Sequence, residues 1–428
     1  MLTATETATA EDELTWHGMT LYGVYDIGVA YLRAGAKVSS SSAAGLNYFI
    51  NKTAHESLVS IAPNGLSQSS IGLRGKEKIA GDFDFIFKLE TGFSPHSFRL
   101  TDGLQSYVYN NGVPQNRQHA AGDSSRAGQA FNGPAYFGFS SATYGSLTLG
   151  RNNLPDRDAM SQYDPLSGSY AFSILSYSNA AAGIGVTEDG RLNNSVKYAY
   201  RYKHVRVSGL FQPGFTQGSP GIAKEIDVGF DQGRWSMDVA WGRKNTAISA
   251  SPLTAEQMAK GAAPDSLAAT ISDNSSYLAM TRYKLDHWTL YAGFVDLRYR
   301  NPSHPLAVPL QGLGGHWFSV VNNSAYPHTK VMKVYWIGFD HPITAKLDLA
   351  AGWYYYSQNA YGVTKCGGAE SPQCSGSQTM PAARLDYRIN RHFDTYAGAM
   401  YSRVSGGMAS GYLHRWNVDP MIGVRFRF

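Results

Sequence analysis

Charged side chains on alternate positions of strand-like runs are the residues of this chain that could do chemistry. Between positions 82 and 93, Asp84, Lys88 and Glu90 alternate with apolar residues. No serine lies in a motif that resembles a Ser-His-Asp arrangement. Metal-ligand spacing is absent among the histidines that we considered, which are His17, His96, His119 and His316. We therefore expect no enzyme, no cofactor and no metal site, and we expect the charges to act on dissolved solutes.

The run from 82 to 93 also shows what kind of element holds these charges. Because successive side chains of a strand point to opposite faces, one face of this strand is charged and the other is apolar. The apolar face contains Phe83, Phe85, Phe87 and Leu89. In a soluble barrel that face would point inward, whereas in a membrane barrel it would meet lipid and the charged face would line water.

The composition favours the membrane barrel. The chain has 428 residues, of which 16% are charged and 13% are aromatic, with 45 glycines and 28 tyrosines. No run of 18 apolar residues occurs, which excludes a transmembrane helix. The net charge of +5 is dispersed, so we expect no nucleic-acid partner. A large soluble all-β protein stays open as the alternative.

The chain divides into strands joined alternately by very short and by long, Gly- and Ser-rich connections. This pattern predicts an antiparallel barrel with short periplasmic turns and long extracellular loops, the first loop covering about 34–66. A ring of sixteen strands is too wide for its side chains to fill and leaves an aqueous channel. The expected strands are 20–33, 67–77, 82–93, 134–141, 146–151, 193–202, 205–213, 223–231, 234–243, 275–285, 287–299, 329–340, 344–357, 378–389, 392–403 and 416–428.

Smaller features complete the expected organisation. Tyr and Trp near strand ends fit aromatic girdles at the two membrane interfaces, with Tyr354 to Tyr356 as the densest group. Cys366 and Cys374 lie in a Gly/Ser/Pro-rich stretch and suggest a local disulfide, with free thiols as the alternative. Residues 1–15 contain no signal-peptide pattern, and we expect an N-terminal extension or an expression remnant there, followed by one barrel over 16–428.

Several segments, in this order, resemble the general porins of Gram-negative bacteria, especially those of the β-proteobacteria. They match the first, second, third and fifth strands of that family, and a terminal aromatic residue resembles its assembly signal. These segments are Met19–Asp26, Ser69–Glu77, Phe87–Phe93, Gly145–Arg151 and the terminal Phe428. The resemblance implies a homotrimer in the outer membrane, with one pore in each subunit.

The resemblance further implies that the third loop, about 152–172, folds into the lumen and faces basic residues of the wall. The candidate loop residues are Arg151, Asp156, Arg157, Asp158 and Asp164. By alternation, the inward basic candidates are Arg74, Lys88, Arg201, Arg282, Arg384 and Arg388. The family's basic residue before the fourth strand falls at Gly133, and Arg126 lies just upstream as a substitute.

The expected function is passive diffusion of ions and small hydrophilic solutes, with a modest anion preference that comes from the basic wall. The expected partners are outer-membrane lipid, lipopolysaccharide and further copies of the chain. Three alternatives stay open. A channel selective for small organic acids is suggested by Arg384, Arg388 and the many tyrosines. An outer-membrane hydrolase and a structural barrel or adhesin with a plugged lumen are the others.

Overall fold

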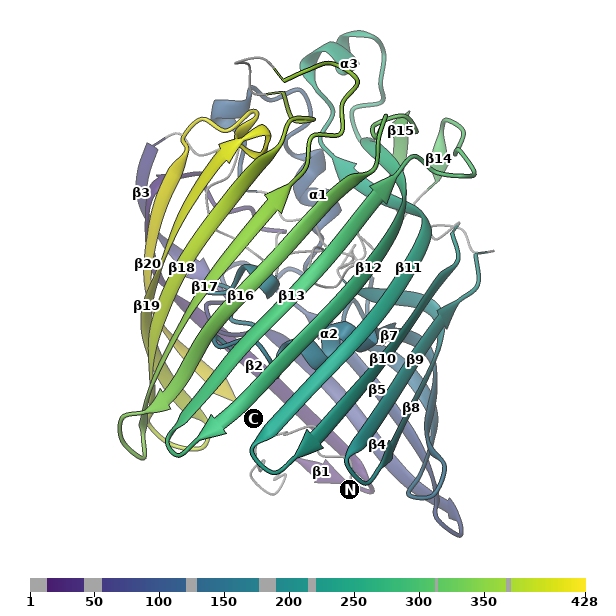
Figure 1. Ribbon diagram of the computed structural model, residues 1–428, viewed down its shortest axis with the longest axis vertical. Coiled ribbons are helices and arrows are strands. Elements are labelled where there is room, and N and C mark those ends of the chain that lie inside the picture. The colour runs from purple at the N-terminus through teal and green to yellow at the C-terminus, as the bar shows by residue number, and fades with distance from the viewer. Residues whose placement is uncertain are drawn as a thin grey trace.

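The computed structural model is a tilted antiparallel β-barrel, and it describes residues 14–41, 56–120, 129–176, 190–214, 221–311, 315–366 and 371–428. Short turns join the strands at one end, where β1 and the C-terminus also lie, and long connections stand at the other end (Figure 1). Within these ranges the sheet has 20 strands. Four of them, β1, β3, β14 and β15, are short additions, so sixteen cross the barrel, as the sequence predicted.

The bounds of the crossing strands agree with the sequence prediction to within a few residues for most strands. The largest differences are at β11 and β12, which extend well beyond the predicted ranges. The strands are β2 (Met19–Gly35), β4 (Ser70–Ala80), β5 (Phe83–Gly92), β6 (Ala135–Ser141), β7 (Gly145–Asn153), β8 (Arg191–Tyr202), β9 (Val205–Gln212), β10 (Ala223–Gln232), β11 (Trp235–Ser251), β12 (Leu267–Leu285), β13 (Trp288–Arg300), β16 (Lys330–Pro342), β17 (Leu347–Gln358), β18 (Gly376–Arg388), β19 (Phe393–Gly406) and β20 (Trp416–Arg427).

The remaining elements are short and belong to the connections. They are β1 (Thr15–Trp16), β3 (Glu56–Pro63), β14 (Leu310–Gln311), β15 (Trp317–Asn322), α1 (Gly103–Val108), α2 (Pro155–Met160), α3 (Ala255–Ala259) and the 3₁₀ turns η1 (Gln115–Arg117), η2 (Ile174–Ser176) and η4 (Gly407–Ala409). None of the helices in the described ranges is long and apolar enough to cross a membrane.

The first and last crossing strands close the ring. β20 pairs antiparallel with β2, from Val24 opposite Arg427 to Ala30 opposite Met421. The backbone of Phe428 continues this ladder, because its N–H and C=O both bond to Gly23. Closure matters because unpaired backbone groups in hydrocarbon cost several kcal/mol each.

The two faces of the wall alternate as the sequence predicted. On β10, Ile226 and Val228 are exposed on the outer surface, whereas Asp227 between them is 5% exposed and points inward. The three consecutive tyrosines on β17 do not form an aromatic girdle, contrary to the sequence prediction. Only Tyr355 faces outward, beside Tyr335, while Tyr354 and Tyr356 are buried inside the barrel.

The first long connection contains a strand that the sequence analysis assigned to a loop. β3 pairs with the upper part of β2, and β4 pairs with the lower part of the same edge. Residues 64–69 interrupt this edge. The carboxylate of Asp26 accepts hydrogen bonds from the backbone N–H groups of Gly65, Leu66 and Ser67 at 2.8–3.1 Å. It therefore replaces the ladder partners that the interruption removes.

The third loop runs inside the barrel, where α2 can be seen behind the front strands (Figure 1). Its apolar side chains pack against the inner wall formed by the strands from β12 round to β3. The buried cluster includes Met160, Tyr163, Leu166, Phe172 and Leu175 of the loop with Met280, Leu297, Trp336, Tyr354, Tyr396 and Met421 of the wall. This side of the lumen is therefore filled by protein.

The loop-end connections also pack against one another. Leu104 of α1 lies in a buried cluster with Ile248 of β11, Ile271 of β12 and Phe318 of β15. The side chain of Asn111 donates to the carbonyls of Pro264 and Ser266. The second long connection is thereby held against the extended β11–β12 hairpin.

Substitution Asp26→Ala should destabilise the barrel by roughly 3 kcal/mol, because three backbone N–H groups, two of them in buried hydrogen bonds, and the Tyr396 hydroxyl lose their acceptor. The free energy of unfolding of the detergent-solubilised protein in denaturant would measure this loss. Asp265→Ala is the control, since Asp265 is exposed in a connection. Equal stability of the Asp26→Ala and control proteins would contradict this account of residues 64–69.

Candidate functional site

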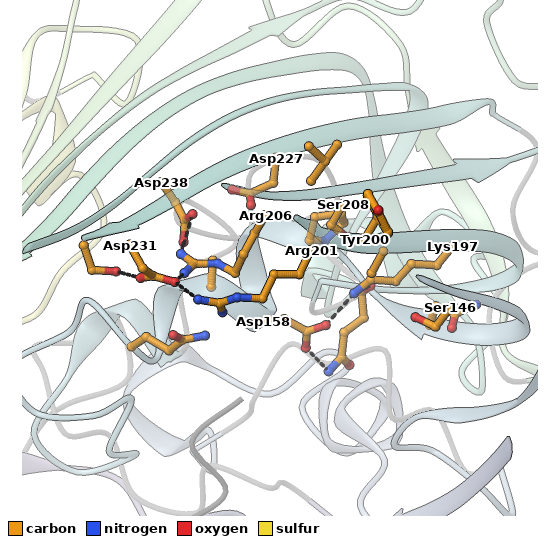
Figure 2. Close-up of a pocket in the computed structure, with 18 of the residues that line it drawn as sticks. Ser146, Asp158, Lys197, Tyr200, Arg201, Arg206, Ser208, Asp227, Asp231 and Asp238 are labelled. Carbon is orange, nitrogen blue, oxygen red and sulfur yellow. Dashed lines mark hydrogen bonds and ion pairs between the residues drawn. The ribbon is translucent and has the colours of Figure 1, made fainter. Parts of the chain in front are cut away.

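The open part of the lumen lies between the third loop and the wall strands from β5 to β12. Its cavity has a volume of about 800 Å³. Figure 2 shows charged and hydroxyl side chains of β7–β11 and the loop pointing into it. The charged residues that line it are Lys88, Asp158, Lys197, Arg201, Arg206, Asp227, Asp231, Arg234, Asp238, Arg282 and Lys284.

Asp158 is the acidic loop residue that reaches this open space. Its carboxylate forms an ion pair with Lys197 of β8 and accepts a 2.7 Å hydrogen bond from Asn153. The charge of Lys197, with hydrogen bonds from Lys197 and Asn153, keeps the pKa of Asp158 below its ordinary value. A negative charge on the loop therefore faces a basic stretch of wall, to which Lys88 also contributes.

A second charged network lies toward the short-turn end of the cavity (Figure 2). Arg201 and Arg206 both contact Asp231, and Arg206 also bonds to Asp238 at 2.9 Å. Arg206 was missing from the residues predicted by sequence. Alternation along β9 places Arg206 on the inward face, where it is the Cα partner of Arg201, so the sequence could have identified it.

Arg74 and Lys88 lie together on the wall, as neighbouring strands would place them. They are Cα partners across β4 and β5, and both cations lie over the ring of Tyr22, at 5.5 and 5.3 Å from its centroid. The Tyr22 hydroxyl donates to Glu90 at 3.0 Å. Tyr22 was not among the predicted residues, although its position on the first strand faces inward by alternation.

Other predicted residues hold the loop against the wall instead of facing open space. Tyr354 donates to Asp164 at 2.5 Å, and Arg384 donates to the carbonyl of Leu166 at 3.1 Å. Trp336 adds a 2.9 Å bond to the carbonyl of Tyr163. Asp164 and Arg384 are therefore loop anchors, which alternation alone could not show.

Arg282 lines the cavity and also holds the loop, because its guanidinium donates to the carbonyl of Gln162 at 3.4 Å. Asp156 is buried in the first turn of α2, where its backbone N–H donates to Glu225 at 2.6 Å. Burial raises the pKa of the Asp156 carboxyl. Arg157 lies with Arg191 in a smaller cavity on the loop, of about 280 Å³.

The last predicted residues lie apart from this group. Arg151 is 5% exposed, and its guanidinium donates to the carbonyls of Asn132 and Gly133, which fixes the start of the third loop. Arg388 is half exposed near the short-turn end and pairs with Asp348 at 3.5 Å. Arg126 lies outside the described residues.

The cysteines of the seventh loop form a disulfide. The two sulfurs of Cys366 and Cys374 are bonded, with their Cα atoms 5.7 Å apart. In the part of the chain that the structure describes, no group of three or more His, Cys, Asp or Glu side chains could hold a metal ion.

Sequence comparison decides the family. A family model described as Gram-negative porin matches residues 1–407. The chain belongs to the Gram-negative porin family. This porin is accordingly a protein of the bacterial outer membrane, as the motifs on its first, second, third and fifth strands had indicated.

Two related proteins match the chain at low sequence identity. The porin is 24% identical to outer membrane porin protein 32 of Delftia acidovorans over 280 residues, which cover 63% of this chain and 65% of that protein. It is 24% identical to an outer membrane porin protein of Bordetella pertussis over 180 residues, or 42% and 38% of the two chains. Each match spans less than two thirds of the relative's length.

Solved structures share the fold at low identity. An anion-selective porin from Comamonas acidovorans superposes with a TM-score of 0.62 at 15% identity, covering 96% of this chain and 99% of that one. The outer-membrane protein OmpT of Vibrio cholerae gives a TM-score of 0.59 at 12% identity, covering 97% and 99%. These likenesses support the closed barrel described above.

The contact between Pro165 and two wall glycines gives a direct test of the loop position. A Cβ at Gly352 would lie 2.9 Å from Cγ of Pro165 and 3.1 Å from the hydroxyl of Tyr354, with no wall backbone atom as near, so Gly352→Ala should push the loop off the wall. We expect several-fold faster trypsin cleavage at Arg157 in the folded barrel.

Gly209→Ala is the matched control, because the nearest atom to its added Cβ is an oxygen at 3.7 Å. Cleavage at the same slow rate in both variants would show that the loop is not held against β16 and β17.

Proposed function

We propose that this porin is a passive channel for ions and small hydrophilic solutes, which cross the barrel on its open side. The observation that carries this proposal is the division of the lumen. Apolar packing fills the side from β12 to β3, and a polar cavity of about 800 Å³ lies beside the loop on the other side. A polar, charged lining suits hydrated solutes, because it replaces part of their hydration shell.

We propose a modest preference for anions. Basic side chains outnumber acidic ones along the cavity, with Lys88, Lys197, Arg201, Arg206, Arg234, Arg282 and Lys284 against Asp158, Asp227, Asp231 and Asp238. Wall charges attract counterions within a Debye length, about 8 Å at physiological ionic strength. One protein of the same fold is named an anion-selective porin, which agrees with this assignment.

Within this channel we assign Asp158 and Lys197, with Arg74 on β4 and Lys88 on β5, to the narrow region. Asp158 projects from the loop toward cations of the wall, which is the geometry of a transverse field. Asp156, Asp164 and Arg384 are assigned to the support of the loop.

We further propose that the working form is a homotrimer surrounded by outer-membrane lipid. Family membership supports this, and one solved structure of the same fold is described as a trimer form. Phe428 would contribute to assembly through its ladder with Gly23, which helps to close the ring.

Selectivity for a particular organic acid has no comparable support. Arg384 and Arg388 suggested a carboxylate site in the sequence. In the structure, Arg384 is bonded to Leu166 of the loop and Arg388 is paired with Asp348. The two guanidinium groups therefore have separate partners and do not share a site.

Substitution Asp158→Asn should raise the ratio of anion to cation permeability by about fourfold. A unit charge about 10 Å from a permeating ion in water changes its energy by roughly 0.4 kcal/mol, a factor of about two that favours anions and disfavours cations when the negative charge is removed. The reversal potential of a planar bilayer under a salt gradient measures the ratio.

The double substitution Lys88→Gln/Lys197→Gln should shift the reversal potential in the opposite direction, and Asp265→Asn on an exposed connection should leave it unchanged. A wild-type channel that prefers cations would overturn the proposed anion preference. Absence of any conductance would overturn the channel itself.

A further inference from the structure

Two neighbouring polar side chains of the cavity have hydrogen-bonding atoms without partners. Asp227 of β10 lines the cavity and is 5% exposed. Its Oδ2 atom is buried and accepts no hydrogen bond from any described residue. The hydroxyl of Ser208 on β9, which also lines the cavity, is likewise buried and has no hydrogen-bond partner in the described ranges (Figure 2).

Small side chains flank these two polar groups. Asp227 is the Cα partner of Ser208 on one side and of Ala240 on the other, and Ser208 is in turn the Cα partner of Ala199 on β8. Directly opposite residues of antiparallel strands have their Cα atoms about 5 Å apart and point to the same face. Asp227 and Ser208 can therefore contact one small group between them. We name Ala199, Ser208, Asp227 and Ala240 the Asp227 recess.

The other acidic residues of the cavity each have a basic partner. Asp158 is paired with Lys197, and Asp231 and Asp238 are both paired with Arg206. None of the described residues forms an ion pair with Asp227. A buried carboxylate without a counter-charge is unfavourable by several kcal/mol, so a cationic group from solution would be stabilised there.

The basic residues beside the recess restrict which cationic group can enter it. Along β8, Lys197 lies two residues from Ala199 toward the loop end, and along β9, Arg206 lies two residues from Ser208 toward the turn end. Figure 2 shows both cations at the same cavity as Asp227. The basic lining repels simple cations but attracts carboxylates. A zwitterion carries both charges, so its carboxylate offsets the repulsion of its ammonium group.

We propose that the Asp227 recess binds the ammonium group of zwitterionic solutes, such as free amino acids, as they cross the channel. The ammonium donates one hydrogen bond to the carboxylate of Asp227 and one to the hydroxyl of Ser208, and its third N–H faces water. The carboxylate of the solute lies toward Lys197 or Arg206. This proposal rests on the channel proposed above and adds a class of solute to it.

Stopped-flow swelling of proteoliposomes that contain the folded porin tests the proposal. Glycine is the zwitterionic probe, and glycolamide, its uncharged isomer, is the reference. Glycine influx should saturate with concentration, whereas glycolamide influx should rise linearly. Asp227→Asn should raise the half-saturating glycine concentration about tenfold, because a hydrogen bond to a charged group is lost. Ser208→Ala should raise it about fivefold, as expected for one hydroxyl acceptor.

Trimethylglycine separates hydrogen bonding from charge, because it is a zwitterion whose ammonium has no N–H donor. Its influx should rise linearly, like that of glycolamide. Saturation at the same concentration as glycine would overturn the assigned hydrogen bonds.

Asp340→Asn is the matched control, since Asp340 is a carboxylate of β16 that does not line the cavity. This variant should keep the half-saturating glycine concentration of the wild type. Linear glycine influx through the wild type, an unchanged value in Asp227→Asn, or an equal rise in the control would each overturn the recess while leaving the channel intact. Absence of glycolamide influx through the wild type would overturn the channel itself, and the recess with it.

Discussion

The interior of a sixteen-stranded ring is wider than its own side chains can fill, and this constraint shapes the rest of the molecule. The wall must close because an open edge in lipid would leave backbone groups unpaired. Closure then creates a lumen that has to hold either water or more protein. The porin uses both, because the third loop fills one side with apolar packing and the other side stays polar.

The position of the loop follows from which inner wall is apolar. Residues such as Leu297, Trp336 and Tyr396 would be exposed to water in an empty barrel, so covering them favours the loop on their side. Specific bonds then set its register, including those of Tyr354 to Asp164 and Arg384 to Leu166. The charged side chains on the uncovered part of the inner wall stay exposed to the lumen, where they can act on solutes.

The sequence predicted the wall well because a strand in lipid has to alternate, and alternation is a local property. It could not show what stands opposite an inward residue. For this reason Arg384 and Tyr354 were assigned to a wall of charges and to an aromatic girdle, whereas both hold the loop. β3 was missed because it shares one edge of β2 with β4, and local alternation does not show which segments share an edge. Arg206 was missed although its alternation was visible.

Cysteine accessibility during single-channel recording tests the two-sided lumen most directly, since both native cysteines are in a disulfide. Ser146 lines the open side, and Ala350 is 1% exposed behind the loop. Modification by a charged thiol reagent should reduce the conductance of Ser146→Cys and leave that of Ala350→Cys unchanged. Equal modification of both positions, or block only at Ala350→Cys, would contradict the division of the lumen.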